Sequence, residues 1–88
     1  METSTEILKE IYDGLKLEND YIDQFWIDRL VTEAHDYYNY AGWAKSLFID
    51  NQTHFLKLHV KLSIARKYAY RFHDFVVAQR KEQNLFIY

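Results

Sequence analysis

Apolar side chains recur every three or four residues along most of the chain, which is the period of a helix packed on another helix. One stripe starts at Ile27 and a second starts at Phe55, and both advance in alternating steps of three and four. These stripes predict one helix over about residues 20–49 and another over about residues 54–83. Their members are Ile27, Leu30, Ala34, Tyr37, Ala41, Ala44 and Phe48, then Phe55, Leu58, Leu62, Ala65, Ala69, Phe72 and Val76.

The polar residues 50–53 separate the two stripes and predict the link of an antiparallel helical hairpin, because short links make neighbours of consecutive helices. In that hairpin Tyr37 faces Ala65, and Ala34 faces Ala69 in the closest layer. The first stripe keeps its count through Gly42. It therefore favours an unbroken helix there, although glycine costs up to about 1 kcal/mol relative to alanine.

A shorter helix is predicted at the N-terminus, over about residues 4–16. Thr3 and Glu6 have the spacing of a capping box, in which each side chain accepts a hydrogen bond from the other residue's backbone. Asn19 or Asp20 then caps the next helix. The sequence thus predicts an all-α fold with a short N-terminal helix packed on a long antiparallel helical hairpin. The apolar stripe of the short helix consists of Ile7, Leu8, Ile11, Tyr12 and Leu15.

The composition suits one packed helical domain over residues 1–88. Hydrophobic residues make up 49% of the chain, proline is absent and there are two glycines. A chain this short buries only about 60 to 65% of its unfolded surface. The predicted hairpin also leaves apolar residues on its outer faces, so we expect it to self-associate as a homo-oligomer into a helical bundle.

Other features bound the location of the protein and its chemistry. The chain has no cysteine, which excludes disulfides and thiolate metal sites. It shows no basic leader before an apolar run, and no run of eighteen apolar residues. We expect a cytoplasmic protein with no membrane partner. The apolar C-terminal segment 84–88 is expected to dock on the fold or to act as a ligand.

The net charge of −2 conceals an uneven distribution. Residues 1–50 carry eleven acidic and four basic side chains, whereas residues 51–88 carry two acidic and seven basic ones. This asymmetry fits an acidic half packed on a basic half of the same fold. The alternative is a nucleic-acid or nucleotide-binding face, although the acidic pI of about 6.0 speaks against it. That face would consist of Lys57, Lys61, Arg66, Lys67 and Arg71.

Aromatic residues make up 18% of the chain and provide the candidate contact residues. Tyrosine and tryptophan are enriched at the energetic centres of protein interfaces, and they also form ordinary core clusters. We predict a non-enzymatic helical protein-protein interaction module, such as a small bacterial or phage regulator, adaptor or inhibitor. Its predicted partner-binding residues are Tyr38, Tyr40, Trp43, Tyr68 and Tyr70.

Catalytic and metal-binding patterns are weak. His54 and His59 are five residues apart, whereas helical metal pairs lie three or four apart, so we expect no metal and no cofactor. No serine or threonine occupies a nucleophile elbow, and we expect no catalytic residue. Arg66 and His73, with six residues between them, loosely resemble the Arg-x4-6-His motif of the HEPN family of α-helical ribonucleases. That resemblance implies a further alternative, in which these two residues act on RNA phosphodiesters at a dimer interface.

Overall fold

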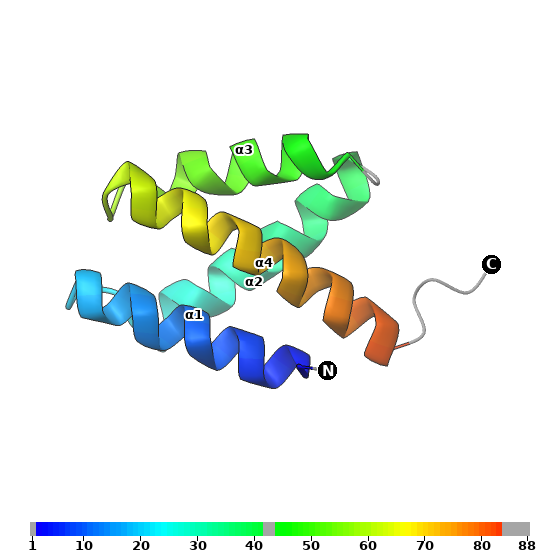
Figure 1. The fold of residues 1–88 in the computed structure, drawn as a ribbon, viewed down its shortest axis with the longest axis horizontal. Coiled ribbons are helices and arrows are strands. Elements are labelled where there is room, and N and C mark those ends of the chain that lie inside the picture. The colour runs from blue at the N-terminus through cyan, green and yellow to red at the C-terminus, as the bar shows by residue number, and fades with distance from the viewer. Residues whose placement is uncertain (1, 42–43, 84–88) are drawn as a thin grey trace.

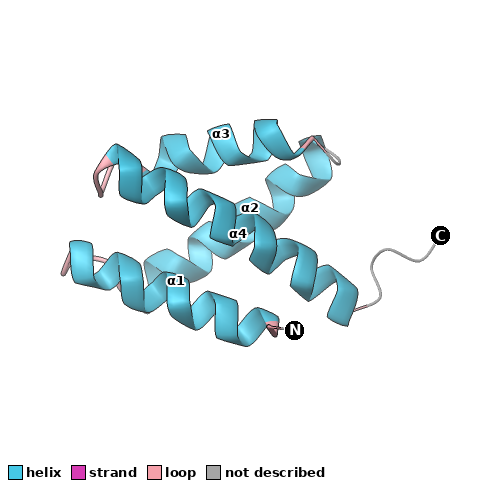
Figure 2. Cartoon of the chain, viewed as in Figure 1, coloured by secondary structure: helices cyan, strands magenta, loops and turns pink. Residues whose placement is uncertain are grey.

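The computed structural model of the protein describes residues 2–41 and 44–83, which form four α-helices and no strand (Figures 1 and 2). The predicted all-α class is confirmed. Gly42, Trp43 and the segment 84–88 lie outside the described residues, so the predictions for Trp43 and for that segment stay predictions. The helices are α1 (Ser4–Glu18), α2 (Gln24–Ala41), α3 (Lys45–Leu56) and α4 (Leu62–Glu82).

Helix α1 begins with the predicted capping box. The Thr3 hydroxyl accepts a hydrogen bond from the Glu6 amide at 3.2 Å, and the Thr3 amide donates to the Glu6 carboxylate at 3.3 Å. The helix continues through Gly14 to Glu18, beyond its predicted end. Glycine is needed at position 14 because a Cβ there would lie 1.7 Å from the Tyr68 hydroxyl oxygen of α4. Gly14 therefore lets α1 and α4 approach closely.

The predicted link at residues 50–53 is wrong, because these residues lie inside α3. Gln52 and Thr53 are buried, and the Thr53 hydroxyl donates to the Ile49 carbonyl at 2.7 Å. With Ile49 and Leu56 they form the buried stripe of α3, at helical spacing. The polarity of Gln52 and Thr53 predicted a turn, but both residues lie on the buried face of a continuous helix.

The two long helices over 20–49 and 54–83 are also wrong, since the chain turns at 57–61 and between α2 and α3. In the first of these turns the His59 and Val60 amides donate to the Leu56 carbonyl at 3.0 and 3.1 Å. Lys61 then starts α4 without a side-chain cap. Helix α2 is described as far as Ala41, and α3 begins at Lys45 with Ala44 as its N-cap. The helical hairpin of this protein is therefore α3 and α4, with residues 57–61 as its link.

Helix α2 begins at Gln24 rather than near residue 20. Asp23 supplies the cap, because its carboxylate accepts a hydrogen bond from the Trp26 amide at 2.9 Å. Asn19 was predicted as a cap, but its side chain instead accepts from the Tyr21 amide at 2.9 Å within the turn. Asn19, Asp20 and Asp23 all precede α2. Only Asp23 immediately precedes Gln24, so its carboxylate reaches the Trp26 amide.

Helix α4 is central in the packing, since α1, α3 and α2 all contact it. Figure 1 shows α1 and α3 on either side of α4, with α2 crossing it at an angle. Ala34 and Ala69 are both fully buried in this core. The predicted register is wrong, however, because Tyr37 lies in α2 and Ala65 in α4, and these helices are separated along the chain by α3. The Tyr37 ring instead lies 6.5 Å from that of Phe48 in α3.

Candidate protein-binding groove

Two adjoining depressions lie between α2 and α3 and together form a groove. They have volumes of about 150 and 320 Å³ and share Glu33 and Phe55 as lining residues. We call this surface the α2–α3 groove. Its lining residues are Trp26, Arg29, Leu30, Glu33, Asp36, Tyr37, Tyr40, Asn51, Phe55, Leu58 and His59.

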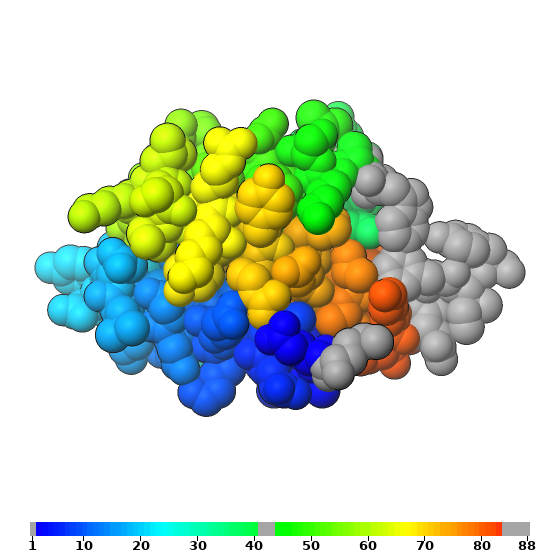
Figure 3. All heavy atoms as spheres, viewed as in Figure 1, coloured from blue at the N-terminus to red at the C-terminus, as the bar shows by residue number. Residues whose placement is uncertain are grey.

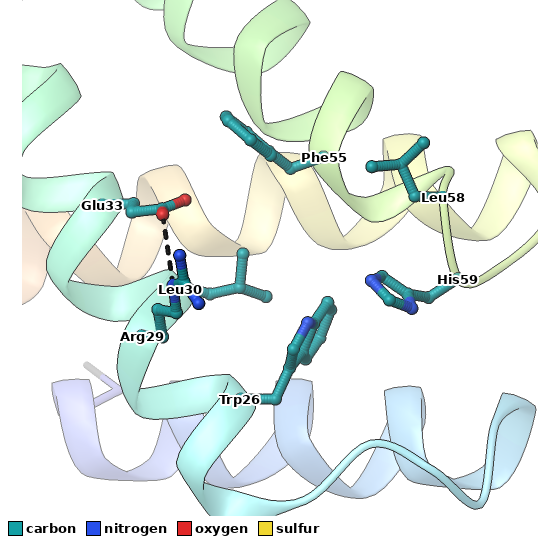
Figure 4. Close-up of a pocket in the computed structure, with 7 residues that line it drawn as sticks. All are labelled: Trp26, Arg29, Leu30, Glu33, Phe55, Leu58 and His59. Carbon is teal, nitrogen blue, oxygen red and sulfur yellow. Dashed lines mark ion pairs between the residues drawn. The ribbon is translucent and has the colours of Figure 1, made fainter.

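The smaller depression is aromatic and apolar at its base. In Figure 4 Trp26 and Leu30 extend from α2 toward Phe55 and Leu58, with His59 facing Trp26. The rings of Trp26 and His59 meet edge to face, with centroids 4.6 Å apart. This contact closes one end of the groove. Arg29 and Glu33, 3.6 Å apart, form its polar border.

The larger depression combines exposed aromatic rings with carboxylates. The rings of Tyr37 and Tyr40 are 6.0 Å apart, and Tyr40 is 87% exposed. Phe55 is 36% exposed where the two depressions join. Glu33 and Asp36 line the same space from α2. Asp36 forms no ion pair within the described residues. This half of the groove is therefore negatively charged.

The pattern of α2 explains why these side chains are left uncovered. Its buried stripe consists of Ile27, Leu30, Ala34 and Tyr38, at helical spacing. Trp26 and Tyr37 flank that stripe and are partly buried, while Tyr40 points away from it. Helix α3 is only 12 residues long and covers part of this flank. The rest remains as the groove.

The predicted partner-binding residues fall into three groups. Tyr40 lines the groove, and Tyr70 is 46% exposed on α4 with the Lys45 ammonium 5.8 Å from its ring. Tyr38 and Tyr68 are 4% and 8% exposed and belong to the core, so they offer no contact surface in this fold. Trp43 lies outside the described residues. Sequence reasoning missed Trp26 and Phe55 as groove residues.

The predicted nucleic-acid-binding residues are not equally available. Lys57, Lys61, Arg66 and Lys67 are exposed. Arg71 instead bridges α1 and α4. Its guanidinium lies 2.6 Å from Glu10, 2.9 Å from Glu2 and 2.9 Å from Asp74. The hydrogen bond to Glu10, followed by those to Asp74 and Glu2, raises the pKa of Arg71. These three carboxylates neutralise the charge of Arg71, so its guanidinium is not available to bind phosphate groups.

Arg66 and His73, the pair that resembles the ribonuclease motif, have different surroundings. Arg66 is exposed, whereas His73 is partly buried against the rings of Phe48 and Tyr38, at 5.4 and 5.9 Å. Burial and the nearby Lys45 lower the pKa of His73. His73 lines a depression between α1, α3 and α4, and Arg66 is not among its lining residues. The fold thus places the two side chains in separate environments of one chain.

Comparison with protein-family models, curated proteins and solved structures finds no match for this chain. None of the helices in the described part of the chain is long and apolar enough to cross a lipid bilayer. Any assignment of function therefore depends on the groove, the exposed side chains and their charges.

Proposed function

We propose that this chain is a non-enzymatic protein-binding module whose α2–α3 groove takes an amphipathic, basic helix of a protein partner. The supporting observation is the joining of the two depressions at Phe55, with Tyr40 exposed beside it and Glu33 and Asp36 along one side. This combination offers apolar anchor sites together with a charge preference.

The shape of the groove favours a helical occupant. It runs between two helices, and amphipathic helices bind such grooves through apolar residues at positions i, i+3, i+4 and i+7. Trp26, Phe55 and Tyr40 are spread along the groove and provide successive contacts for such a stripe. Aromatic side chains of this kind dominate binding energies at protein interfaces.

The charge of the groove favours a basic occupant. Asp36 has no cationic neighbour within 4.0 Å among the described residues, and Glu33 has only the exposed Arg29 at 3.6 Å. Lysine or arginine residues beside the partner's apolar stripe would complement these carboxylates. Such complementary charges increase association rates and exclude acidic partners. A small regulator, adaptor or inhibitor would use this surface to recognise its target.

A display library of random helical peptides, selected on the purified chain, tests the proposal. We expect enriched sequences with apolar residues at i, i+3, i+4 and i+7 and with flanking lysine or arginine. Their affinity should fall about tenfold or more for Tyr40→Ala and for Asp36→Lys. Tyr70→Ala is the matched control, since it truncates an exposed tyrosine on another helix, and it should bind as the unmodified chain does.

Several outcomes would overturn the proposal. One is enrichment of peptides that bind the Tyr40→Ala and Asp36→Lys variants unchanged, and another is enrichment of no common pattern. A salt titration with single-stranded RNA tests the competing nucleic-acid function. Binding through phosphate contacts to Lys57, Lys61 and Arg66 would weaken steeply as salt increases, and peptide binding through aromatic contacts should change little.

Self-association, expected from the sequence, is also part of the proposal.

A further inference from the structure

Exposed apolar side chains gather on two turns at one end of the molecule. Leu17 and Tyr21, next to or within the turn between α1 and α2, are 87% and 93% exposed. Leu58 and Leu62, at the turn between α3 and α4, are 67% and 59% exposed. Figures 1 and 3 show both turns at the same end, where the chain is cyan and yellow-green. We call this surface the turn end.

Specific contacts hold the two turns against each other. The Asn19 side-chain amide donates to the His59 carbonyl at 3.1 Å, which joins one turn directly to the other. The same Asn19 side chain accepts from the Tyr21 amide, and the Trp26 ring packs on the His59 ring. The apolar side chains of the turn end are therefore presented together by a fixed backbone.

The two turns carry opposite charges. Glu18 and Asp20 are exposed on one turn, and Lys57 and Lys61 are exposed on the other. Within the described residues, none of these four side chains forms an ion pair. Lys16 lies near the acidic turn, but its ammonium is directed to Tyr12, which it contacts at 3.3 Å. One turn thus has two exposed apolar residues beside exposed carboxylates, and the other has two exposed apolar residues beside exposed ammonium groups.

We propose that the turn end is the interface of a homodimer, with a two-fold axis passing between the two turns. A two-fold axis pairs the same patch on both copies, so the patch must complement itself. Rotation about this axis places the acidic turn of each copy over the basic turn of its partner. Four apolar side chains from each copy are then covered, and eight charges are paired.

The charge pattern selects a second copy over other occupants. An anionic bilayer would attract Lys57 and Lys61 but repel Glu18 and Asp20, which adjoin the same apolar residues. An unrelated protein would need the same division into acidic and basic halves, and a second copy has it by construction. The dimer interface does not include Phe55, Tyr40 or Asp36, and Leu58 is the exposed apolar residue that it shares with the groove.

Charge reversal tests this dimer. The Glu18→Lys/Asp20→Lys variant has two basic turns, and the Lys57→Glu/Lys61→Glu variant has two acidic turns. We expect sedimentation velocity to show a dimer for the unmodified chain, and dissociation constants at least about tenfold higher for each variant alone. An equimolar mixture should restore a dimer, and native mass spectrometry should identify it as the heterodimer, because all four turns then pair with opposite charges.

Control variants separate this dimer from other assemblies. Tyr40→Ala and Asp36→Lys alter the groove and should leave the dimer unchanged, whereas Leu62→Ser should weaken it. The heterodimer also shows that both charge-reversed chains fold, because an unfolded chain would not recover the assembly. A monomeric unmodified chain at millimolar concentration would overturn the inference. Charge-reversed chains that still form homodimers, or a mixture that stays monomeric, would overturn it too.

Discussion

Replacing Gly14 by alanine has two opposite effects on stability, a gain in helix propensity and a loss of packing between α1 and α4. Alanine is favoured over glycine in a helix interior by up to about 1 kcal/mol, so sequence alone predicts a more stable α1. In the structure a Cβ at this position would lie 1.7 Å from the Tyr68 hydroxyl oxygen and 2.3 Å from Cζ of the same ring. Tyr68 is 8% exposed and has little room to move. Overpacking of this kind costs about 1 to 3 kcal/mol.

We therefore expect Gly14→Ala to lower the free energy of unfolding by about 1 to 2 kcal/mol. In a domain of this size that corresponds to a Tm lower by roughly 4 to 16 °C. Urea unfolding followed by circular dichroism at 222 nm measures it, with an unchanged m-value showing that the unfolded state is comparable.

A double-mutant cycle with Tyr68→Leu isolates the cause, because leucine has no atoms at the positions of Cζ and the hydroxyl. In that background Gly14→Ala should be neutral or stabilising, since only the helix propensity remains. The reasoning would be refuted if Gly14→Ala stabilised the unmodified chain, or if it had the same effect in both backgrounds.

Three further changes probe buried and titrating groups. Gln52→Met should raise the Tm, because it removes a fully buried amide oxygen that has no hydrogen-bond partner in the described residues. Leaving such a group unpaired costs about 1 to 3 kcal/mol of stability. A lower Tm would contradict this. Since burial and Lys45 lower the pKa of His73, the folded state binds a proton less readily than the unfolded state. Stability should fall as the pH drops below about 6.5, and His73→Phe should flatten that fall in urea titrations between pH 7.5 and 5.5. Hydrogen bonds from Ser4 hold the pKa of Glu82 below its ordinary value. The ionised Glu82 carboxylate therefore stabilises the fold at neutral pH, and this stabilisation is lost as the pH falls through the folded-state pKa. Glu82→Gln should then destabilise the chain at pH 7 and do so progressively less as the pH is lowered, and an effect that does not change with pH would contradict this.

The sequence predicted the parts of the fold that depend on local chemistry. The capping box at Thr3 and Glu6 formed because its two hydrogen bonds need only four consecutive residues. The stripes from Ile27 to Ala34 and from Ala65 to Val76 are buried as their period indicated. Periodicity of this kind indicates which face of a helix is inside, and it was correct for these two segments.

The position of the turns was not predictable in the same way. Residues 57–61 contain no glycine, proline or asparagine, so nothing in them signals a turn. Gln52 and Thr53 are polar but lie inside, where helix packing on α4 outweighs their preference for water. The displaced turn explains why Leu58 and Leu62, expected in the hairpin seam, are exposed.

The difference between the predicted and observed helix ends also explains why the predicted site residues differ from the residues that line the groove. Tyr38 lies four residues after Ala34 on the buried stripe of α2, and its ring packs against those of Phe48 and His73. Phe55 borders the groove because α3 ends one residue later, which leaves its ring only partly covered. Composition predicted aromatic contact residues but not their exposure. Only the three-dimensional arrangement shows which rings are free.

The pairing of α1 with α4 has a consequence for biosynthesis. The two are joined by Ser4 to Glu82 and by Glu10 to Arg71, so the first helix rests on the last one. A ribosome releases α1 well before α4 has been made, and an isolated helix of 15 residues is marginal in water. The nascent chain therefore holds Ile7, Ile11 and Leu15 uncovered until α4 has been synthesised.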